Sequence, residues 1–146
     1  MSVRHIEHIG IVVDDLEAAT EFFLALGLQV EGKTSVSGEL VDQINGLEGV
    51  EADVVILQTP EGGSKLELAR YRAPSYEGDA SPAAPANTPG IRHILFVVDD
   101  AAESLARLQE HGGELVGELV NYEDIYWLCY VRGPAGIIVE LAQKIG

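Results

Sequence analysis

The sequence predicts an α+β fold made of two tandem modules, each with the order strand, helix, strand, strand, strand (βαβββ). The main observation is an internal repeat, because "IEHIGIVVDD" near the start returns as "IRHILFVVDD" past the middle. A shift of 85 positions aligns residues 6–32 with 91–117 and leaves nine identical pairs. The two copies also end alike, since each closes on a stretch that contains Glu-Leu-Ala. A duplicated supersecondary unit explains both likenesses.

Each copy opens with a strand and a helix. The apolar run before each Asp-Asp pair suits a strand, and the pair can cap the helix that follows. Gly27 and Gly112 stand where the two helices should end, because glycine tolerates the left-handed conformation at a helix C-terminus. Apolar residues spaced by three and four give each helix one buried face. These residues are Leu16, Ala19, Phe23 and Leu26 in the first copy and Ala101, Leu105 and Leu108 in the second.

Each copy closes with a hairpin. The stretches "LQTPEGGSKLELAR" and "VRGPAGIIVELAQ" both read as strand, Pro-Gly turn and strand. The longer middle of the first copy, "SVSGELVDQINGLEGVE", should hold an extra loop or a short helix. The four prolines of "RAPSYEGDASPAAPANTPG" indicate a linker. We therefore expect a single domain over 1–146, with module one at 1–72, a linker at 73–90 and module two at 91–146.

Composition narrows the classes of function. With 146 residues, 47% of them hydrophobic, the chain can bury a core. Its net charge of -15 disfavours nucleic acid and anionic membranes as partners, since both need clustered Lys and Arg. Cys129 is the only cysteine, so no intrachain disulfide is expected and a reducing, cytoplasmic location is the simpler interpretation. The N-terminus, with Arg4 and Glu7 and no long apolar run, resembles neither a signal peptide nor a membrane anchor.

Four polar residues stand in otherwise apolar strands. Alternate strand residues face opposite sides, so His8 should lie opposite Ile9, on the face turned away from the following helix. His93 repeats this arrangement in the second copy, and Glu67 and Glu140 are each flanked by apolar residues in the closing strands. If a pseudo-twofold relates the modules, two imidazoles and two carboxylates could converge on one divalent cation, such as zinc, nickel, cobalt, iron or manganese.

Each of these residues also has a simpler explanation. A lone histidine in a strand is usually half-buried without any ligand, and a lone glutamate is most often solvated on an open face. The repeat favours the metal site, because both modules offer an early His and a late Glu in matching positions. His5 and His111 have no counterpart in the other copy and are expected at the surface. Cys129 is expected in the core.

Aromatic residues near the C-terminus offer a second kind of site. Tyr122, Tyr126, Trp127 and Tyr130 could stack on an aromatic ligand, although strand and core packing explains most of them as well. The chain has no Gly-x-Gly-x-x-Gly motif and no phosphate loop. The stretch "SVSGE" does not have the strand-to-helix Gly-x-Ser-x-Gly pattern of a nucleophile elbow.

The stretches "EHIGIVVDDLEAATEFFLALGL", "KLEL", "RHILFVVDD" and "GIIVEL" resemble the vicinal oxygen chelate superfamily, which includes glyoxalases, bleomycin-resistance proteins and extradiol dioxygenases. The resemblance covers nearly the whole chain. It implies the vicinal oxygen chelate fold, in which the two modules form a shared cupped sheet. It also implies one divalent metal ion, held by first and last strands of each module through His8, Glu67, His93 and Glu140, a set that looks like that of glyoxalase I.

The resemblance further implies a glyoxalase-like lyase or isomerase, acting through a metal-bound enediolate on a small oxygenated substrate. Glu140 would be the catalytic base, with Glu67 as its rival. Three alternatives stay open: an isomerase like methylmalonyl-CoA epimerase, a non-enzymatic binding or resistance protein for a small aromatic compound, and an extradiol-type dioxygenase. The arginine and asparagine pattern that glyoxalase I uses around glutathione is missing. A homodimer is also implied, with the site inside one chain or between subunits.

Overall fold

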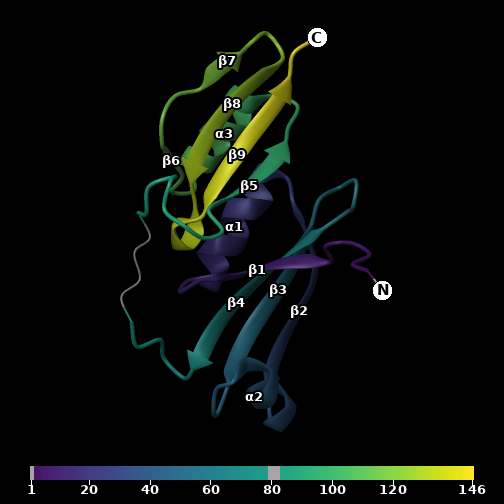
Figure 1. The fold of residues 1–146 in the computed structure, drawn as a ribbon, viewed down its shortest axis with the longest axis vertical. Coiled ribbons are helices and arrows are strands. Elements are labelled where there is room, and N and C mark those ends of the chain that lie inside the picture. Colours follow the sequence, from purple (N-terminus) through teal and green to yellow (C-terminus); the bar gives the residue numbers. More distant parts are fainter. Residues whose placement is uncertain (1, 79–82) are drawn as a thin grey trace. The chain divides into compact units, whose positions relative to one another are not determined.

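The computed structural model describes residues 2–78 and 83–146, and the chain forms two compact units, Met1–Asp79 (unit 1) and Ala80–Gly146 (unit 2). Figure 1 shows unit 1 in purple to teal and unit 2 in green to yellow. The boundary falls inside the expected linker, of which residues 79–82 lie outside the described residues. Each unit has its own sheet and is described by itself. Among the helices of the described residues, none has the length and apolar character needed to cross a membrane.

Unit 1 has a four-stranded sheet in the order β1-β4-β3-β2. Its elements are β1 (His8–Val12), α1 (Leu16–Leu26), β2 (Gln29–Ser37), α2 (Glu39–Asn45), β3 (Glu51–Gln58) and β4 (Lys65–Ala73). The first and last strands, β1 and β4, lie side by side and are parallel, whereas the other neighbours are antiparallel. This order places the first strand of the unit beside its last strand. His8, on β1, is thereby brought next to β4, the strand that carries Glu67.

The helix α1 begins and ends at the residues that the sequence indicated. Asp15, the second residue of the Asp pair, caps it by accepting a hydrogen bond from the Ala18 amide at 3.0 Å. Gly27 ends it with φ of 117°, in the left-handed region. The buried face includes Ala19 and Phe23, as expected, and also Phe22, which is 1% exposed. The buried stripe is therefore rotated toward Phe22, and Leu16 and Leu26 are only partly covered.

The extra length of the first copy forms a short helix, α2, and a loop. No residue of α2 is buried, so packing on the core does not hold it in place. The Asp42 carboxylate accepts hydrogen bonds from the amides of Gly49 and Val50 at 2.9 and 2.8 Å, which closes the loop after the helix. The Tyr71 hydroxyl donates to Asn45 Oδ1 at 2.6 Å and ties the end of α2 to the sheet. Polar contacts thus position this segment.

Unit 2 repeats the plan with a sheet in the order β5-β9-β8-β6, to which β7 adds by pairing with β8. Its elements are β5 (His93–Val97), α3 (Ala101–Gln109), β6 (Glu114–Leu115), β7 (Val120–Tyr122), β8 (Tyr126–Arg132), the 3-10 turn η1 (Pro134–Gly136) and β9 (Ile138–Lys144). As in unit 1, the first and last strands, β5 and β9, are parallel neighbours. The α+β prediction with two tandem modules is confirmed.

The helix α3 follows the prediction at its start, and Gly112 has the expected left-handed conformation, with φ of 87°, although the helix itself ends earlier. Asp100 caps it through the Glu103 amide at 3.0 Å, and Ala101, Leu105 and Leu108 are buried. The helix ends at Gln109, three residues before Gly112. A tight turn follows, in which a Cβ placed on Gly113 would lie 2.8 Å from the Leu108 carbonyl oxygen. The absence of a side chain at Gly113 is therefore what allows the chain to turn back toward β6.

Candidate metal site

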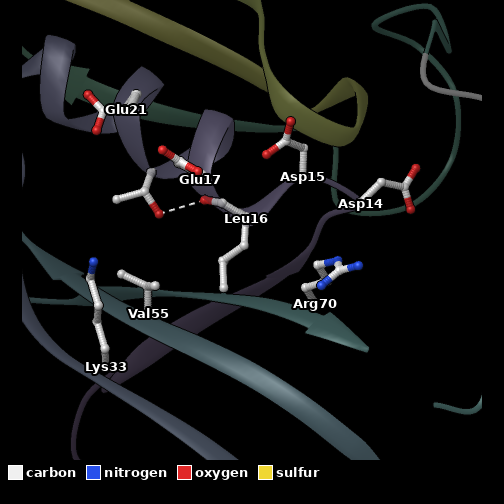
Figure 2. A pocket seen from close by; sticks show the side chains of 9 residues that line it. Asp14, Asp15, Leu16, Glu17, Glu21, Lys33, Val55 and Arg70 are labelled. Atoms are coloured by element: carbon white, nitrogen blue, oxygen red, sulfur yellow. Dashed lines mark hydrogen bonds between the residues drawn. The ribbon is translucent and has the colours of Figure 1, made fainter. Parts of the chain in front are cut away.

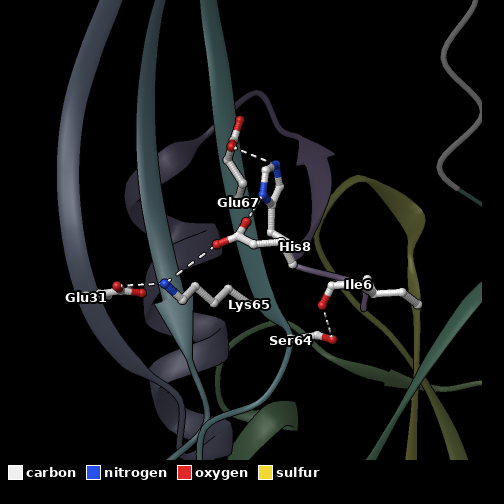
Figure 3. A network of polar contacts seen from close by, with 7 residues as sticks. Ile6, His8, Glu31, Ser64, Lys65 and Glu67 are labelled. Carbon is white, nitrogen blue, oxygen red and sulfur yellow. Dashed lines mark hydrogen bonds and ion pairs between the residues drawn. The ribbon is translucent and has the colours of Figure 1, made fainter. Parts of the chain in front are cut away.

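In unit 1, His8 and Glu67 lie on the same face of the sheet. The parallel register places Gly10 beside Glu67, and His8 is two residues before Gly10 on the same face of β1. The opposite face carries Ile11, which is buried under α1. The His8 and Glu67 side chains meet with His8 Nε2 3.1 Å from Glu67 Oε2 (Figure 3). We call the face with His8 and Glu67 the open face of unit 1, because α1 covers the other side.

A series of charged residues lies next to His8 on the side away from Glu67. Glu7 Oε2 is paired with His8 Nδ1. Lys65 Nζ lies 3.7 Å from Glu7 Oε1 and 2.8 Å from Glu31 Oε1. Figure 3 shows Lys65 reaching toward Glu31, while His8 reaches toward Glu67. The hydrogen bond with Glu7, helped by the charge of Glu67, raises the pKa of His8 above its usual 6.5, and the same bond lowers the pKa of Glu7.

Unit 2 contains the matching pair. Leu95 of β5 lies beside Glu140 of β9, and His93 is two residues before Leu95. His93 Nε2 lies 3.4 Å from Glu140 Oε1. The face is again the one turned away from the helix, since Gln143, on the opposite face of β9, accepts a hydrogen bond from the Ala101 amide of α3 at 2.9 Å. The face with His93 and Glu140 is the open face of unit 2.

The two pairs have the donor separations of metal ligands. Imidazole nitrogen and carboxylate oxygen bind zinc-like ions at about 2.1 Å, so two ligands of one ion at tetrahedral or octahedral angles lie about 3.0–3.4 Å apart. The observed separations of 3.1 and 3.4 Å fall in this range. Within the described part of each unit, no group of three or more His, Cys, Asp or Glu residues gathers as a complete site. Each unit therefore offers two donors of a kind that suits a divalent transition metal.

The aromatic residues divide between the two faces of the unit 2 sheet. Tyr130 lies opposite Glu140 in the β8–β9 register, and Tyr126 and Tyr122 share its face through the register with β9 and β7. The Tyr130 ring is centred 5.1 Å from the His93 ring. Trp127 alternates with Tyr126 and Tyr130 and pairs with Gln143, so it belongs to the helix side. The structure thus brings the three tyrosines, and not Trp127, to the face of His93 and Glu140.

The remaining candidates lie away from the pairs. His5 is exposed, and the exposed His111 has its Nδ1 3.0 Å from the Arg107 carbonyl oxygen. Cys129 is buried on the helix side of β8, where burial raises the pKa of its thiol from 9.0 to about 11, with a smaller contribution from the Glu140 charge.

An open cavity of about 650 Å³ lies on the other side of the unit 1 sheet (Figure 2). Asp14, just before α1, lines it together with Glu17 and Glu21 of the helix, and the sheet contributes Lys33, Val55 and Arg70. In the β2–β3 register Lys33 pairs with Val55, which places both on the face that α1 covers. This cavity is therefore separated from His8 and Glu67 by the sheet itself.

Sequence reasoning missed the residues that support the two histidines. Glu7 precedes the first strand and looked like an ordinary charged residue, and Lys65 and Glu31 become its neighbours only through strand pairing. Tyr130 was considered as one of several residues that could stack on a ligand, but its contact with His93 depends on the order β5-β9-β8 of the folded sheet. No local pattern signals either arrangement.

Comparison with solved structures shows close relatives of the fold. A glyoxalase family protein from Bacillus cereus is 38% identical, with a TM-score of 0.94 over 100% of this chain and 97% of that one. TnmS3, an antibiotic binding protein from a Streptomyces species, is 20% identical, with a TM-score of 0.59 over 99% of this chain and 98% of that one. A glyoxalase I mutant from Zea mays is 16% identical, with a TM-score of 0.66, and is matched over 97% of this chain and 45% of its own length.

A search of curated proteins gave no significant match. The family profile described as Glyoxalase/Bleomycin resistance protein/Dioxygenase superfamily matches residues 5–141, a range that includes both His–Glu pairs. Because the match spans most of the sequence and the fold agrees with it, the chain belongs to the Glyoxalase/Bleomycin resistance protein/Dioxygenase superfamily.

Proposed function

We propose that this protein is a metal-dependent lyase or isomerase that moves a proton between neighbouring carbons of a small oxygenated substrate. We further propose that His8, Glu67, His93 and Glu140 are the protein ligands of one divalent cation. The observation that carries the proposal is the occurrence of two His–Glu pairs, on corresponding strands of the two units, with donor separations of 3.1 and 3.4 Å. Proteins of this superfamily typically bind a divalent metal ion and small-molecule substrates.

The charges of the ligand set support a divalent ion. Two carboxylates carry two negative charges and two neutral imidazoles carry none, so the four residues balance a charge of two. A bound divalent cation would polarise a carbonyl oxygen of the substrate and so acidify the neighbouring C–H bond. The protein must then supply a base close to that bond, to take the proton from one carbon and return a proton to the next.

Glu140 is the better candidate for the base. Its side chain is 14% exposed, compared with 32% for Glu67. A more buried carboxylate has less hydration to lose when a substrate covers it, so it can approach a C–H bond at a smaller cost in solvation. Leu95 and Tyr130 flank Glu140 on the open face. Glu67, with twice the exposure, suits a ligand role.

The proton transfer can be tested without knowledge of the natural substrate. The metal-loaded protein is incubated in D2O with a panel of small compounds that carry two adjacent oxygens, and NMR follows deuterium uptake next to the carbonyl. We expect uptake with the wild type, and a loss of about 100-fold or more with Glu140→Gln, because general base catalysis contributes about 10²–10⁴-fold. Glu114→Gln removes the same charge at an exposed strand position of unit 2 and should behave as the wild type.

Two results would contradict the proposal. In one, chelator-treated protein exchanges as fast as the metal-loaded protein. In the other, Glu140→Gln exchanges normally while Glu67→Gln does not, which would transfer the role of the base to Glu67. Circular dichroism of each variant confirms that the fold persists.

A second candidate function is the binding of an aromatic compound without chemistry. It is favoured by Tyr122, Tyr126 and Tyr130, which share the open face of unit 2, and the fold is also that of an antibiotic binding protein. Calorimetry would show micromolar binding of an aromatic ligand to chelator-treated protein, and Tyr130→Ala would weaken it. Proton exchange that depends on metal would favour the enzyme instead.

A further inference from the structure

We propose that Glu7 is a positioning residue for the His8 imidazole, and that Lys65 holds Glu7 in this role. The inference rests on the proposed function, because it concerns how His8 is presented to a metal ion. It adds two residues, Glu7 and Lys65, to a site that otherwise consists of ligands alone.

The first step is the use of the two ring nitrogens of His8. Nδ1 is paired with Glu7 Oε2, and Nε2 lies 3.1 Å from Glu67 Oε2. A proton on Nδ1, donated to Glu7, leaves the lone pair on Nε2, on the side of Glu67. A carboxylate that accepts from the second nitrogen fixes the tautomer and the ring orientation of a metal-binding histidine and raises its basicity. Glu7 has the chemistry and the position for this task.

The second step is the fixation of Glu7 itself. Its other carboxylate oxygen, Oε1, lies 3.7 Å from Lys65 Nζ, so the two oxygens have different partners. Lys65 is next to His8 in the strand register, and its Nζ lies 2.8 Å from Glu31 Oε1. Glu31 stands where the β2–β3 register shifts, at a bulge. The connected residues Glu31, Lys65 and Glu7 carry a net charge of -1. This charge favours electron donation from the His8 imidazole to a metal ion.

Unit 2 provides an internal comparison. The position equivalent to Glu7 is Arg92, whose guanidinium donates to the carbonyl oxygens of Thr88 and Pro89 at 3.1 and 2.9 Å. Arg92 is therefore engaged by the preceding loop. His93 instead lies against the Tyr130 ring, with the centroids 5.1 Å apart. The two units thus orient corresponding histidines by different means, a carboxylate in unit 1 and an aromatic ring in unit 2.

The test measures metal affinity in the full-length protein by competition with a chromophoric chelator, with Zn²⁺ and Co²⁺ as probes. We expect Glu7→Gln to weaken binding about 10- to 100-fold, the usual effect of losing such an outer carboxylate. Lys65→Met should weaken it less, because Glu7 keeps its contact with His8. Glu48→Gln removes the same charge at an exposed position of unit 1 and should bind within about twofold of the wild type.

A second measurement does not involve metal. Nitrogen-15 NMR of the chelator-treated protein, recorded at alkaline pH where the imidazoles are neutral, reports the tautomer of each histidine. The wild type should show His8 protonated at Nδ1, and Glu7→Gln should shift it toward a mixture of tautomers, with His93 unchanged. A purely structural role of Glu7 would lower the thermal midpoint of the metal-free protein and leave the tautomer of His8 as it was, which would overturn the inference.

The outcomes separate the two proposals. If the wild type binds no divalent cation, or if His8→Ala and Glu67→Gln bind as tightly as the wild type, the proposed function fails. If those variants lose affinity but Glu7→Gln does not, the metal site stands and the role of Glu7 is wrong. Loss of affinity with Glu7→Gln, together with the change of tautomer, supports both.

Discussion

At the scale of single residues, the two open faces differ in what lies beside each histidine. His8 is held among charged groups, since it is paired with Glu7, which in turn lies beside Lys65, whereas His93 lies against Tyr130. Glu140 is also the more buried of the two carboxylates. The pairs are therefore equivalent in their donor atoms and unequal in their surroundings, which fits a division of tasks between ligand and base.

The sequence could predict the donors but not their support. The repeat and the strand alternation assign His8, Glu67, His93 and Glu140 to corresponding positions, since both signals are local or come from the comparison of the two copies. Contacts between a residue before β1 and others on β4 and β2 depend on strand order and register, which no local pattern encodes. That these four donors bind a single cation remains a prediction.

Cys129 gives a prediction that depends on pH. Its thiol pKa is raised from 9.0 to about 11, so the reactive thiolate is about 100-fold scarcer in the folded protein at any pH below 9. We expect iodoacetamide at pH 8 to label Cys129 in the folded protein at least about 100-fold more slowly than in the denatured protein. The rate of labelling in the folded protein should increase as the pH approaches 11. Mass spectrometry measures the rates. Equal rates in the two states would contradict the burial of Cys129.

At the scale of elements, the helix starts show what local signals achieve. Each Asp-Asp pair predicted a cap, and in both units the second aspartate provides it, through the amide three residues later. Both glycines also adopt the left-handed conformation that was expected, with φ of 117° at Gly27 and 87° at Gly112. Gly27 follows α1 directly, whereas α3 ends three residues before Gly112, and the turn at Gly113 packs closely on Leu108. A Cβ on Gly113 would also lie 3.0 Å from Val131 Cγ1 of β8, a tertiary contact that spacing alone could not reveal.

The caps lead to a stability prediction. Asp15→Ala removes the acceptor of the Ala18 amide and should lower the free energy of unfolding by about 1 kcal/mol, the usual effect of losing a helix cap. Asp14→Ala, at the exposed neighbouring position, is the matched control and should change it by less than about 0.5 kcal/mol. Urea unfolding followed by circular dichroism measures both. A larger loss at Asp14 would show that the first aspartate of the pair is the cap.

At the scale of the whole molecule, the chain is two copies of one plan with a strongly acidic surface. Both units pair their first strand with their last, and both turn a His–Glu pair away from the helix. The net charge of -15 favours the approach of cations over that of nucleic acid. Members of this superfamily often form dimers, and we expect this chain to form a homodimer with twice its 15.7 kDa mass in light scattering.

Metal binding should stabilise the folded protein as a whole. A ligand at 100 times its dissociation constant adds about 2.7 kcal/mol to the free energy of unfolding, so Zn²⁺, Ni²⁺, Co²⁺ or Mn²⁺ should raise the midpoint of thermal unfolding by several degrees. Calorimetry with and without chelator measures the shift, and elemental analysis should find one ion per chain. Glu67→Gln and Glu140→Gln should each abolish most of the shift, and Glu48→Gln should keep it. Two ions per chain would mean that each pair binds separately.

The parallel pairing of β1 with β4 also determines when the first pair of donors can exist. His8 leaves the ribosome early, but its strand has no neighbour until Lys65–Ala73 has been made, and Glu67 belongs to that same strand. Such a long sequence separation delays sheet closure until nearly the whole unit is available. A nascent chain therefore cannot hold an ion through this pair before unit 1 is complete, and capture of the proposed metal ion would be coupled to the end of folding.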